Sequence, residues 1–188
     1  MQSKSKRFTT RQLTTIAILA AISVVLFYKL DFSNLPVLLG AFAMGPGPAT
    51  LILLIKSLLG LLHTSSQGVG ELADFLMGFA MILPAGLIYQ RHKTRKGALI
   101  GLVVGTVAAT IAGVLSNLWL MIPFYGAVYG MPVEQIVSMG QALIPAIQDE
   151  WGFVLLITGP FNLVKWILIS VVTLLVYKPL SPLLHHQG

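Results

Sequence analysis

Long runs of apolar residues separated by short polar segments form the dominant pattern of the chain. The runs occupy about residues 13–28, 35–44, 48–62, 72–90, 97–124 and 152–177. About 20 consecutive apolar residues are long enough to cross the hydrocarbon core of a bilayer as a helix. The pattern therefore predicts an all-α, polytopic membrane protein in which residues 1–188 form a single membrane-embedded domain.

The second and third runs can be interpreted in two ways. The segment Gly45-Pro46-Gly47-Pro48 could interrupt one helix or form the turn between two crossings. The second run alone would span only about 15 Å at the rise of an α-helix. Hydropathy does not decide between the two interpretations.

The distribution of positive charge does decide between them. Basic residues cluster within residues 4–11 and again within 91–96. Positive charge flanking membrane helices marks the cytoplasmic side, so an even number of crossings must separate the clusters. The sequence therefore predicts six transmembrane helices with both termini in the cytoplasm.

The composition supports a membrane protein and excludes several other classes. The chain is 56% hydrophobic and 10% charged, with a mean hydropathy of +0.86. Its net charge of +6 comes from clusters beside apolar runs, which indicates topology marking and no nucleic-acid partner. It contains no cysteine, which excludes disulfides and thiolate sites. A signal peptide is the competing interpretation of the N-terminus, but no small-x-small cleavage pattern follows the first run.

The long connection between the last two runs contains a further periodic pattern. Apolar residues within 132–147 recur at helical spacing, which predicts a short amphipathic helix at the membrane interface. Such a helix could act as a lid over the bundle or simply rest at the interface, and the sequence leaves both possibilities open.

Small residues indicate where helices approach closely. Gly101, Gly105, Ala109 and Gly113 recur at every fourth position of the fifth run and predict close packing against another helix of the bundle. Ala17 and Ala21 have the same spacing on the first run, where the pattern fits either internal packing or docking of a partner.

Motifs for catalysis and for energy coupling are absent from the sequence. It has no G-x-x-x-x-G-K-[ST] phosphate loop, no H-E-x-x-H zinc motif and no G-x-S-x-G nucleophile elbow. The four histidines are too scattered to indicate a metal site. We therefore predict no enzymatic activity, no resident cofactor and no bound metal.

Two polar residues in the last run stand out against this background. Asn162 and Lys165 are three positions apart, so they share one face of a helix. A charge within a spanning segment usually faces the bundle interior or a water-filled cavity. If the last helix has Pro160 in its first turn, both residues lie near the outer mouth. Lys165 could instead extend outward to the membrane surface.

Other polar residues are expected at the same outer end, and each has a structural alternative. Glu71 and Asp74 could bind a ligand or complement the positive end of their helix. Asp31 could belong to a site or to a turn, and Asn117 could bind a ligand or form an interhelical hydrogen bond. Lys56 could pair with Asp74, extend away from the core or contact a ligand.

Several ordered motifs carry a resemblance to a known family. They are Lys29-Leu30-Asp31-Phe32-Ser33-Asn34-Leu35-Pro36, Gly45-Pro46, Ile55-Lys56-Ser57-Leu58-Leu59, Gly68-Val69-Gly70-Glu71-Leu72-Ala73-Asp74-Phe75-Leu76 and Gly159-Pro160-Phe161-Asn162-Leu163-Val164-Lys165. With them the chain resembles the riboflavin-specific substrate-binding subunits, or S components, of energy-coupling factor (ECF) transporters over nearly its whole length.

The resemblance implies a function, a location and a set of partners. It implies high-affinity capture of riboflavin, with its phosphate FMN as a second candidate ligand, from outside a bacterial cell by a multi-pass subunit surrounded by membrane lipid. Uptake then requires a transmembrane coupling subunit and two ATP-binding subunits. In this family an A-x-x-x-A element on the first helix docks the coupling subunit, and Ala17 and Ala21 match it.

The resemblance also implies roles for individual residues. Ligand contacts are expected from Glu71, Asn117, Asn162 and Lys165, with the loop from Asp31 to Leu35 closing over the ring. An amide and an ammonium can pair with the uracil-like edge of a flavin, and aromatic side chains can pack on its face. Three positions depart from the family pattern: Asn34 replaces a common aspartate, and Ser57 and Asp74 replace common asparagines.

Three alternative functions remain at this point. The chain could be the same type of subunit for another small vitamin. It could be a small intramembrane enzyme that uses Glu71, Asp74 and His63 on a lipid-like substrate. It could also be a structural membrane subunit that binds no ligand.

Overall fold

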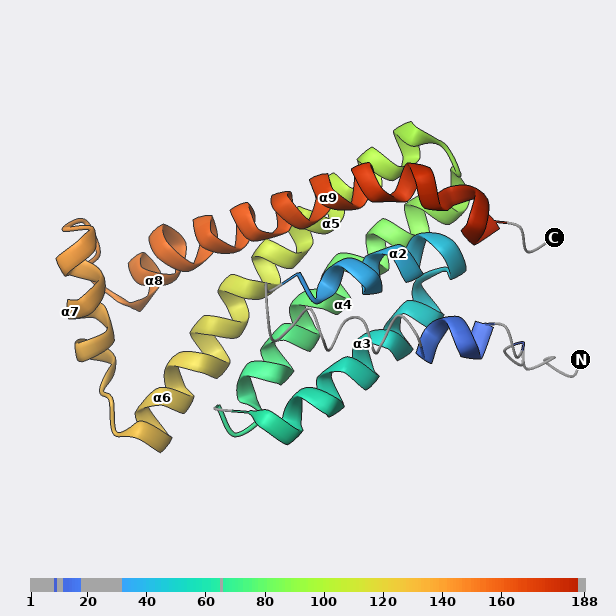
Figure 1. Cartoon of the computed structure of the whole chain (residues 1–188). Coiled ribbons are helices and arrows are strands. Elements are labelled where there is room, and N and C mark those ends of the chain that lie inside the picture. Colours follow the sequence, from blue (N-terminus) through green and yellow to red (C-terminus); the bar gives the residue numbers. More distant parts are fainter. Residues whose placement is uncertain (1–8, 10–11, 18–31, 65, 186–188) are drawn as a thin grey trace, which may run out of the picture.

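The computed structural model describes residues 9, 12–17, 32–64 and 66–185, and every regular element among them is a helix (Figure 1). Residues 12–17 are helical, and the rest of the first apolar run lies outside the described residues. The other elements are α2 (Asn34–Met44), α3 (Pro46–Gly60), η1 (Leu61–His63), α4 (Val69–Arg91), α5 (Arg95–Ser116), η2 (Asn117–Met121), α6 (Ile122–Tyr129), α7 (Val133–Leu143), α8 (Glu150–Phe153), η3 (Val154–Thr158) and α9 (Gly159–His185).

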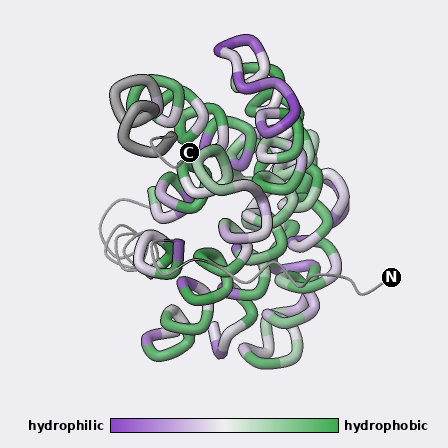
Figure 2. The backbone as a smooth tube through the Cα atoms, turned by 90° about the vertical axis from the view of Figure 1, so that its right-hand side faces the viewer, coloured by the Kyte–Doolittle hydropathy of each residue, from purple (hydrophilic) through white to green (hydrophobic). Residues whose placement is uncertain are grey.

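Four helical stretches of the described chain are long and apolar enough to cross a membrane. They are Pro46–His63, Val69–Arg91, Arg95–Tyr129 and Glu150–Tyr177, and α2 is a shorter apolar helix. The hydrophobic tube in Figure 2 is interrupted by short hydrophilic segments. The prediction of an all-helical membrane protein is therefore confirmed for the described residues. A turn at Gly45 separates α2 from α3, as the charge argument required.

The backbone at Gly45 explains why the chain turns there. Gly45 has φ of 93°, a region that residues with a Cβ rarely adopt, and Pro46 begins α3 because its missing N–H needs no partner in the first turn. Gly86 of α4 packs against Pro46, where an added Cβ would lie 3.2 Å from Pro46 Cδ. Gln90 donates from Nε2 to the Phe42 carbonyl at 3.0 Å and ties α4 to the end of α2.

The small-residue stripe of α5 packs as the sequence predicts. An added Cβ on Gly101 would lie 2.9 Å from the Ala85 carbonyl oxygen, and one on Gly105 would lie 2.7 Å from that of Met81. α5 therefore contacts the backbone of α4 directly, and this is the most extensive helix pair. α9 lies along the other side of α5, while α2 contacts α3, α4 and α9 (Figure 1).

The two longest helical stretches each pass through a proline by forming a π-helical segment. η2 precedes Pro123 and η3 precedes Pro160, each ending two residues before the proline. The Ile122 N–H donates to the Asn117 carbonyl and the Gly159 N–H to the Val154 carbonyl, five residues back. This wider turn accommodates a residue that has no N–H and whose ring would clash with the preceding α-helical turn.

These π segments change two sequence predictions. The fifth helical run continues beyond residue 124 to Tyr129, where Gly130 ends it with φ of 62°. Pro160 is the second residue of α9, as expected, but α9 directly continues α8 and η3, so the helical run that contains it begins at Glu150. The Asp149 side chain caps it by accepting from the Gly152 N–H at 2.7 Å.

The predicted amphipathic helix is present as α7. Its buried residues Ile136, Val137 and Gly140 face the bundle, and Gly140 packs against the Phe153 ring. Met139 and Leu143 are exposed on the remaining surface. α6, α7 and α8 gather at one end of the bundle in Figure 1, so the long connection is mostly helical.

Candidate functional site

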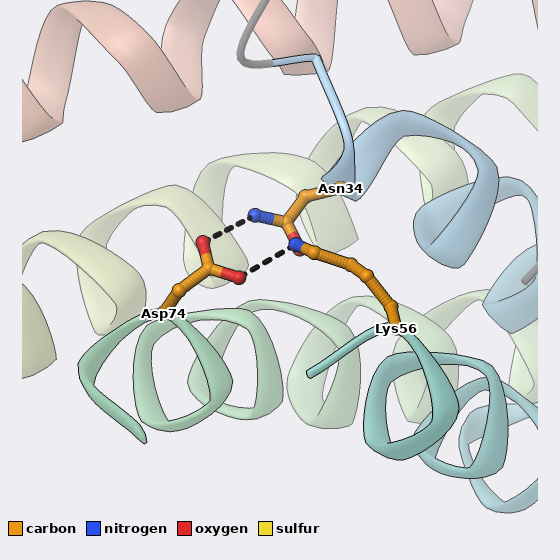
Figure 3. Close-up of polar contacts among 3 residues, drawn as sticks. All are labelled: Asn34, Lys56 and Asp74. Atoms are coloured by element: carbon orange, nitrogen blue, oxygen red, sulfur yellow. Dashed lines mark hydrogen bonds and ion pairs between the residues drawn. The ribbon is translucent and has the colours of Figure 1, made fainter. Parts of the chain in front are cut away.

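A ring of three buried polar side chains joins α2, α3 and α4. Lys56 Nζ donates to Asp74 Oδ2 at 2.6 Å and to Asn34 Oδ1 at 2.9 Å. Asn34 Nδ2 donates to Asp74 Oδ1 at 3.0 Å, which closes the ring (Figure 3). Both atoms of the asparagine amide and both oxygens of the carboxylate are therefore used.

The ring satisfies charges that would otherwise be costly to bury. The side chain of Lys56 is 3% exposed and that of Asp74 is 13% exposed. A buried ion pair persists only when additional hydrogen bonds satisfy the remaining groups, and Asn34 supplies them here. Of the sequence alternatives for Lys56, pairing with Asp74 is confirmed.

Two of the three positions at which the resemblance implied a departure lie in this ring. Asn34 and Asp74 are hydrogen-bond partners of each other. Exchanging the carboxylate and the amide between these positions would keep one carboxylate beside Lys56. The ring would therefore contain the same set of groups in either arrangement.

Glu71 lies one turn before Asp74 on α4 and is bound by the preceding loop. Its Oε2 accepts from Thr64 Oγ1 at 2.7 Å and from Ser66 Oγ at 3.2 Å. Its stem packs over Gly60, where an added Cβ would lie 3.2 Å from Glu71 Cγ. Glu71 is buried in the first turn of its helix, so its charge also complements the positive helix end.

A small cavity separates Glu71 from the buried ring. It has a volume of about 10 Å³ and is lined by Lys56, Ser57, Gly60, Glu71 and Asp74. A space of this size is about that of one water molecule or one hydroxyl group. Ser57 Oγ is buried and has no hydrogen-bond partner among the described residues, so the cavity has an unused donor and acceptor in its wall.

Two asparagine amides meet at Gly113 on the neighbouring helices. Asn117 Nδ2 donates to the Gly113 carbonyl at 2.9 Å. Asn162 lies over the same glycine, where an added Cβ would be 2.9 Å from Asn162 Cγ, and its Nδ2 donates to the Thr158 carbonyl at 2.9 Å. Each amide uses one N–H in its own helix, which leaves its second N–H and its oxygen for a ligand.

Lys165 lies on the same face of α9 as Asn162. It is half-buried one turn after Asn162, and its Nζ lies 5.9 Å from the centroid of the Trp166 ring. Its ammonium also lies within electrostatic reach of the Asp74 carboxylate. Lys165 therefore faces the interior side of α9, as the sequence predicted for a charge in a spanning helix.

The aromatic residues near the site differ in burial. Trp166 is fully buried, and its Nε1 has no hydrogen-bond partner among the described residues. Trp119 and Phe161 are 68% and 66% exposed, so they lie on the surface of the bundle. Phe32 packs against the main hydrophobic core.

The remaining sequence-predicted residues are only partly described. Leu35 follows Asn34 in the first turn of α2 and is half-buried. Ala17 is exposed on the short first helical segment. Asp31 and Ala21 lie outside the described residues. Within the described chain, no group of three or more metal-ligating side chains forms a metal site.

We name the end of the bundle that carries Asn34, Glu71, Asn117 and Asn162 the site end, and the end that carries the turn at Gly45 the opposite end. Sequence reasoning assigned Glu71, Asn117, Asn162 and Lys165 to one ligand site. The structure places Asn117 and Asn162 beside Gly113 and Glu71 beside Thr64 and Ser66, and their common role in one site stays a prediction. Sequence reasoning missed Thr64 and Ser66, because hydroxyl residues in a loop carry no distinguishing sequence signal. It also missed the partnership of Asn34 with Lys56.

The chain was compared with known families, curated proteins and solved structures. A family model described as "ECF transporter, substrate-specific component" matches residues 11–177. A riboflavin transporter named RibU from Staphylococcus aureus (strain TCH60) is 31% identical over 183 residues, which covers 91% of this chain and 90% of that protein. A riboflavin transporter named FmnP from Bacillus subtilis (strain 168) is 27% identical and covers 94% of this chain and 95% of that protein.

A solved structure gives the same result at the level of the fold. It is described as the S component of a bacterial ECF transporter and superposes with a TM-score of 0.71 at 31% sequence identity. The superposition covers 94% of this chain and 98% of the matched chain. The similarity therefore extends over the whole helical bundle and includes the site end.

Proposed function

This chain belongs to the substrate-specific components of ECF transporters, and we propose that it binds riboflavin at its site end and delivers it for uptake across a bacterial cell membrane. Its relatives are transporters and not enzymes, in agreement with the sequence prediction. Riboflavin is thus the transported ligand and not a cofactor. We assign the site end to the extracellular side.

The position of Asn117 and Asn162 beside Gly113, with Lys165 one turn after Asn162 on α9, supports the assignment of the ligand. The edge of the flavin ring presents two carbonyl oxygens and an imide N–H between them, and the available amide atoms and the ammonium offer matching donors and acceptors. Placing these groups on two rigid helices holds them in one geometry before the ligand arrives. The ring edge is proposed to bind there.

The opposite pole of the ligand is proposed to bind near Glu71. The ribityl chain of riboflavin carries hydroxyl groups, and an ionised carboxylate accepts hydrogen bonds from hydroxyls. Glu71 already accepts from two hydroxyls of its own loop, so the local geometry suits such groups. Asp31 and Leu35 are proposed to close the loop between the first helix and α2 over the ring.

The proposed topology has six transmembrane helices with both termini in the cytoplasm. The four long apolar stretches, the shorter α2 and the apolar run at residues 13–28 supply the six. The basic clusters at residues 4–11 and 91–96 then share the cytoplasmic side. Lipid surrounds the exposed apolar side chains of the bundle.

The proposed partners are a transmembrane coupling subunit and two ATP-binding subunits. The chain has no phosphate-binding loop of its own, so the energy for release must come from another subunit. Ala17 is exposed, which suits a docking contact, and Ala21 has the matching spacing four residues later.

A titration tests the ligand assignment. Purified protein should quench the fluorescence of added riboflavin at a stoichiometry of about one, because a single ligand pocket is proposed. The same titration with FMN measures how far a phosphate on the chain is tolerated. Protein that is folded yet binds neither flavin contradicts the assignment.

The Lys165→Met variant tests the site. We expect the Kd for riboflavin to rise roughly tenfold or more, because a charged hydrogen-bond donor to the ligand is lost. Helical content should not change, since methionine keeps the apolar stem. Lys96→Met is the matched control, because Lys96 is exposed at the opposite end. Unchanged affinity in Lys165→Met removes Lys165 from the site.

The Ala17→Trp variant tests docking. A bulky ring at an exposed small residue should block close helix approach and abolish co-purification with the coupling subunit, while riboflavin binding is retained. Val103→Trp places equal bulk on an exposed position of α5 and serves as the control. Retained assembly in Ala17→Trp places the docking surface elsewhere.

A further inference from the structure

The loop between η1 and α4 makes an unusual number of hydrogen bonds around one carboxylate. We propose that Thr64 is a positioning residue that orients Glu71 toward the hydroxylated chain of the ligand and so determines how strongly that chain contributes to binding. The inference rests on the proposed function, because it concerns the affinity for a flavin that carries a hydroxylated chain.

The hydrogen bonds of Thr64 show which acceptor receives its hydroxyl proton. Its Oγ1 accepts from the backbone N–H of Ser66 at 3.2 Å and from that of Gly68 at 3.0 Å. A hydroxyl has one proton, and the shortest contact of this one is the 2.7 Å approach to Glu71 Oε2. Thr64 therefore donates to the carboxylate while two loop amides hold its oxygen in place.

Ser66 provides a second and weaker support. Its Oγ accepts from the Gly70 N–H at 2.9 Å. Ser66 Oγ lies 3.2 Å from both Glu71 Oε2 and Thr64 Oγ1, so its own proton is shared between two acceptors. Since Thr64 makes the shorter bond to the carboxylate, we infer that Thr64 contributes more to its orientation.

The loop backbone is shaped to hold these hydroxyls. Gly68 has φ of 90°, and an added Cβ there would lie 2.9 Å from Leu61 Cδ2. Gly70 permits the close approach of Ser66, because an added Cβ would lie 2.6 Å from Ser66 Oγ. These two glycines and three backbone hydrogen bonds to side-chain hydroxyls hold Thr64 and Ser66 in place beside Glu71.

The two loop hydroxyls leave part of the carboxylate free. Both hydrogen bonds that the described residues make to Glu71 reach Oε2. A carboxylate has about four acceptor positions on its two oxygens, so Oε1 remains for hydroxyls of a ligand. Thr64 thus fixes one oxygen and presents the other, and this lowers the entropy lost when the ligand binds.

A competing arrangement predicts the opposite change in the Kd for riboflavin. If the loop hydroxyls occupied the position that ligand hydroxyls need, removing Thr64 Oγ1 would free Glu71 and tighten binding. Positioning predicts weaker binding after the same change. The direction of the change in Kd therefore separates the two arrangements.

The experiment compares two flavins on one variant. Riboflavin carries the hydroxylated chain, and lumiflavin has the same ring without it. Thr64→Val preserves the shape of the side chain and removes its hydroxyl. We expect the Kd for riboflavin to rise roughly tenfold, as for loss of a hydrogen bond to a charged group, with the Kd for lumiflavin unchanged.

Two further variants complete the test. Thr64→Ser keeps the hydroxyl and should restore riboflavin affinity to within about threefold, and Ser66→Ala should have a smaller effect than Thr64→Val because its contact is longer. A general loss of folding would weaken both flavins together, so lumiflavin binding is the internal control.

Each outcome has a defined meaning. Selective loss of riboflavin affinity in Thr64→Val with rescue by Thr64→Ser supports the proposal. Unchanged or tighter riboflavin binding, or equal weakening for both flavins, overturns it. If the wild-type protein binds neither flavin, the proposed function itself fails, and that result is visible before any variant is tested.

Discussion

Helices α2 and α4 contact each other in different ways at the two ends of the bundle. At the opposite end, Phe42 stacks on Tyr89 with ring centroids 4.6 Å apart, and Tyr177 meets both rings edge-on at 5.3 Å. At the site end, the same two helices are joined by the ring of Asn34, Lys56 and Asp74. The contacts between α2 and α4 are therefore aromatic at the opposite end and polar at the site end.

This difference follows from what each end has to do. Aromatic contacts and direct backbone packing leave no space and no unused hydrogen-bonding atoms, so they suit an end that holds the helices together. A site for a polar ligand needs donors and acceptors that are not consumed by the fold. The site end meets this need because Lys56 and Asp74 are paired with each other, while the amides of Asn117 and Asn162 keep an N–H and an oxygen that the fold does not use.

The largest expected effect comes from breaking the polar ring. Asp74→Ala leaves the Lys56 ammonium buried without its carboxylate, and we expect the free energy of unfolding to fall by about 3–5 kcal/mol. Thermal or denaturant unfolding in detergent, followed by circular dichroism, measures this loss. A change below about 1 kcal/mol would mean that water or another group replaces the carboxylate.

A double variant provides the matched control for Asp74→Ala. Asn34→Asp combined with Asp74→Asn exchanges the carboxylate and the amide but keeps one of each beside Lys56. We expect its stability to lie within about 1 kcal/mol of the wild type, because the two changes are coupled through one hydrogen bond. If the exchange is as harmful as Asp74→Ala, the position of the charge matters and not only its presence.

A smaller effect is expected from disturbing the close packing of α4 and α5. Gly105→Val inserts a branched side chain where even a Cβ would lie 2.7 Å from the Met81 carbonyl oxygen. We expect a loss of about 1–3 kcal/mol in stability from overpacking, measured by the same unfolding experiment. Riboflavin affinity of the remaining folded protein should not change, since the packing lies away from the proposed ligand contacts.

Gly126→Val is the control for that substitution. Gly126 is a helical glycine of α6 whose added Cβ would lie no closer than 3.6 Å to any neighbouring atom, so the same change in side chain meets no close contact there. Equal destabilisation by both variants would show that helix propensity, rather than the contact with Met81, causes the loss.

The smallest change in stability is expected at the π segment of the last helix. Pro160→Ala restores a backbone N–H that can bond four residues back, so stability should change by less than about 1 kcal/mol. We expect riboflavin affinity to fall severalfold, because rewinding η3 would turn Asn162 away from Gly113. Flavin titration and unfolding of the same sample measure both quantities, and unchanged affinity would show that η3 does not set the orientation of Asn162.

The sequence determined the helical class and most helix positions, because both depend on local properties. Runs of apolar residues predicted α3, α4 and α5 to within a few residues at most ends. The spacing of Gly101 and Gly105 predicted a packing surface, since residues four apart lie on one face of any helix. The resemblance to the family placed Glu71, Asn117, Asn162 and Lys165 in one site.

Only the tertiary structure decided the contacts that join distant segments. Asn34 and Asp74 are 40 residues apart, and their hydrogen bond exists because α2 and α4 approach each other at that level. The passage of α9 through Pro160 depends on a π segment that hydropathy does not encode. Thr64 donates to Glu71 because the backbone turns at Gly68, which has a positive φ. The pattern of apolar residues does not predict this turn.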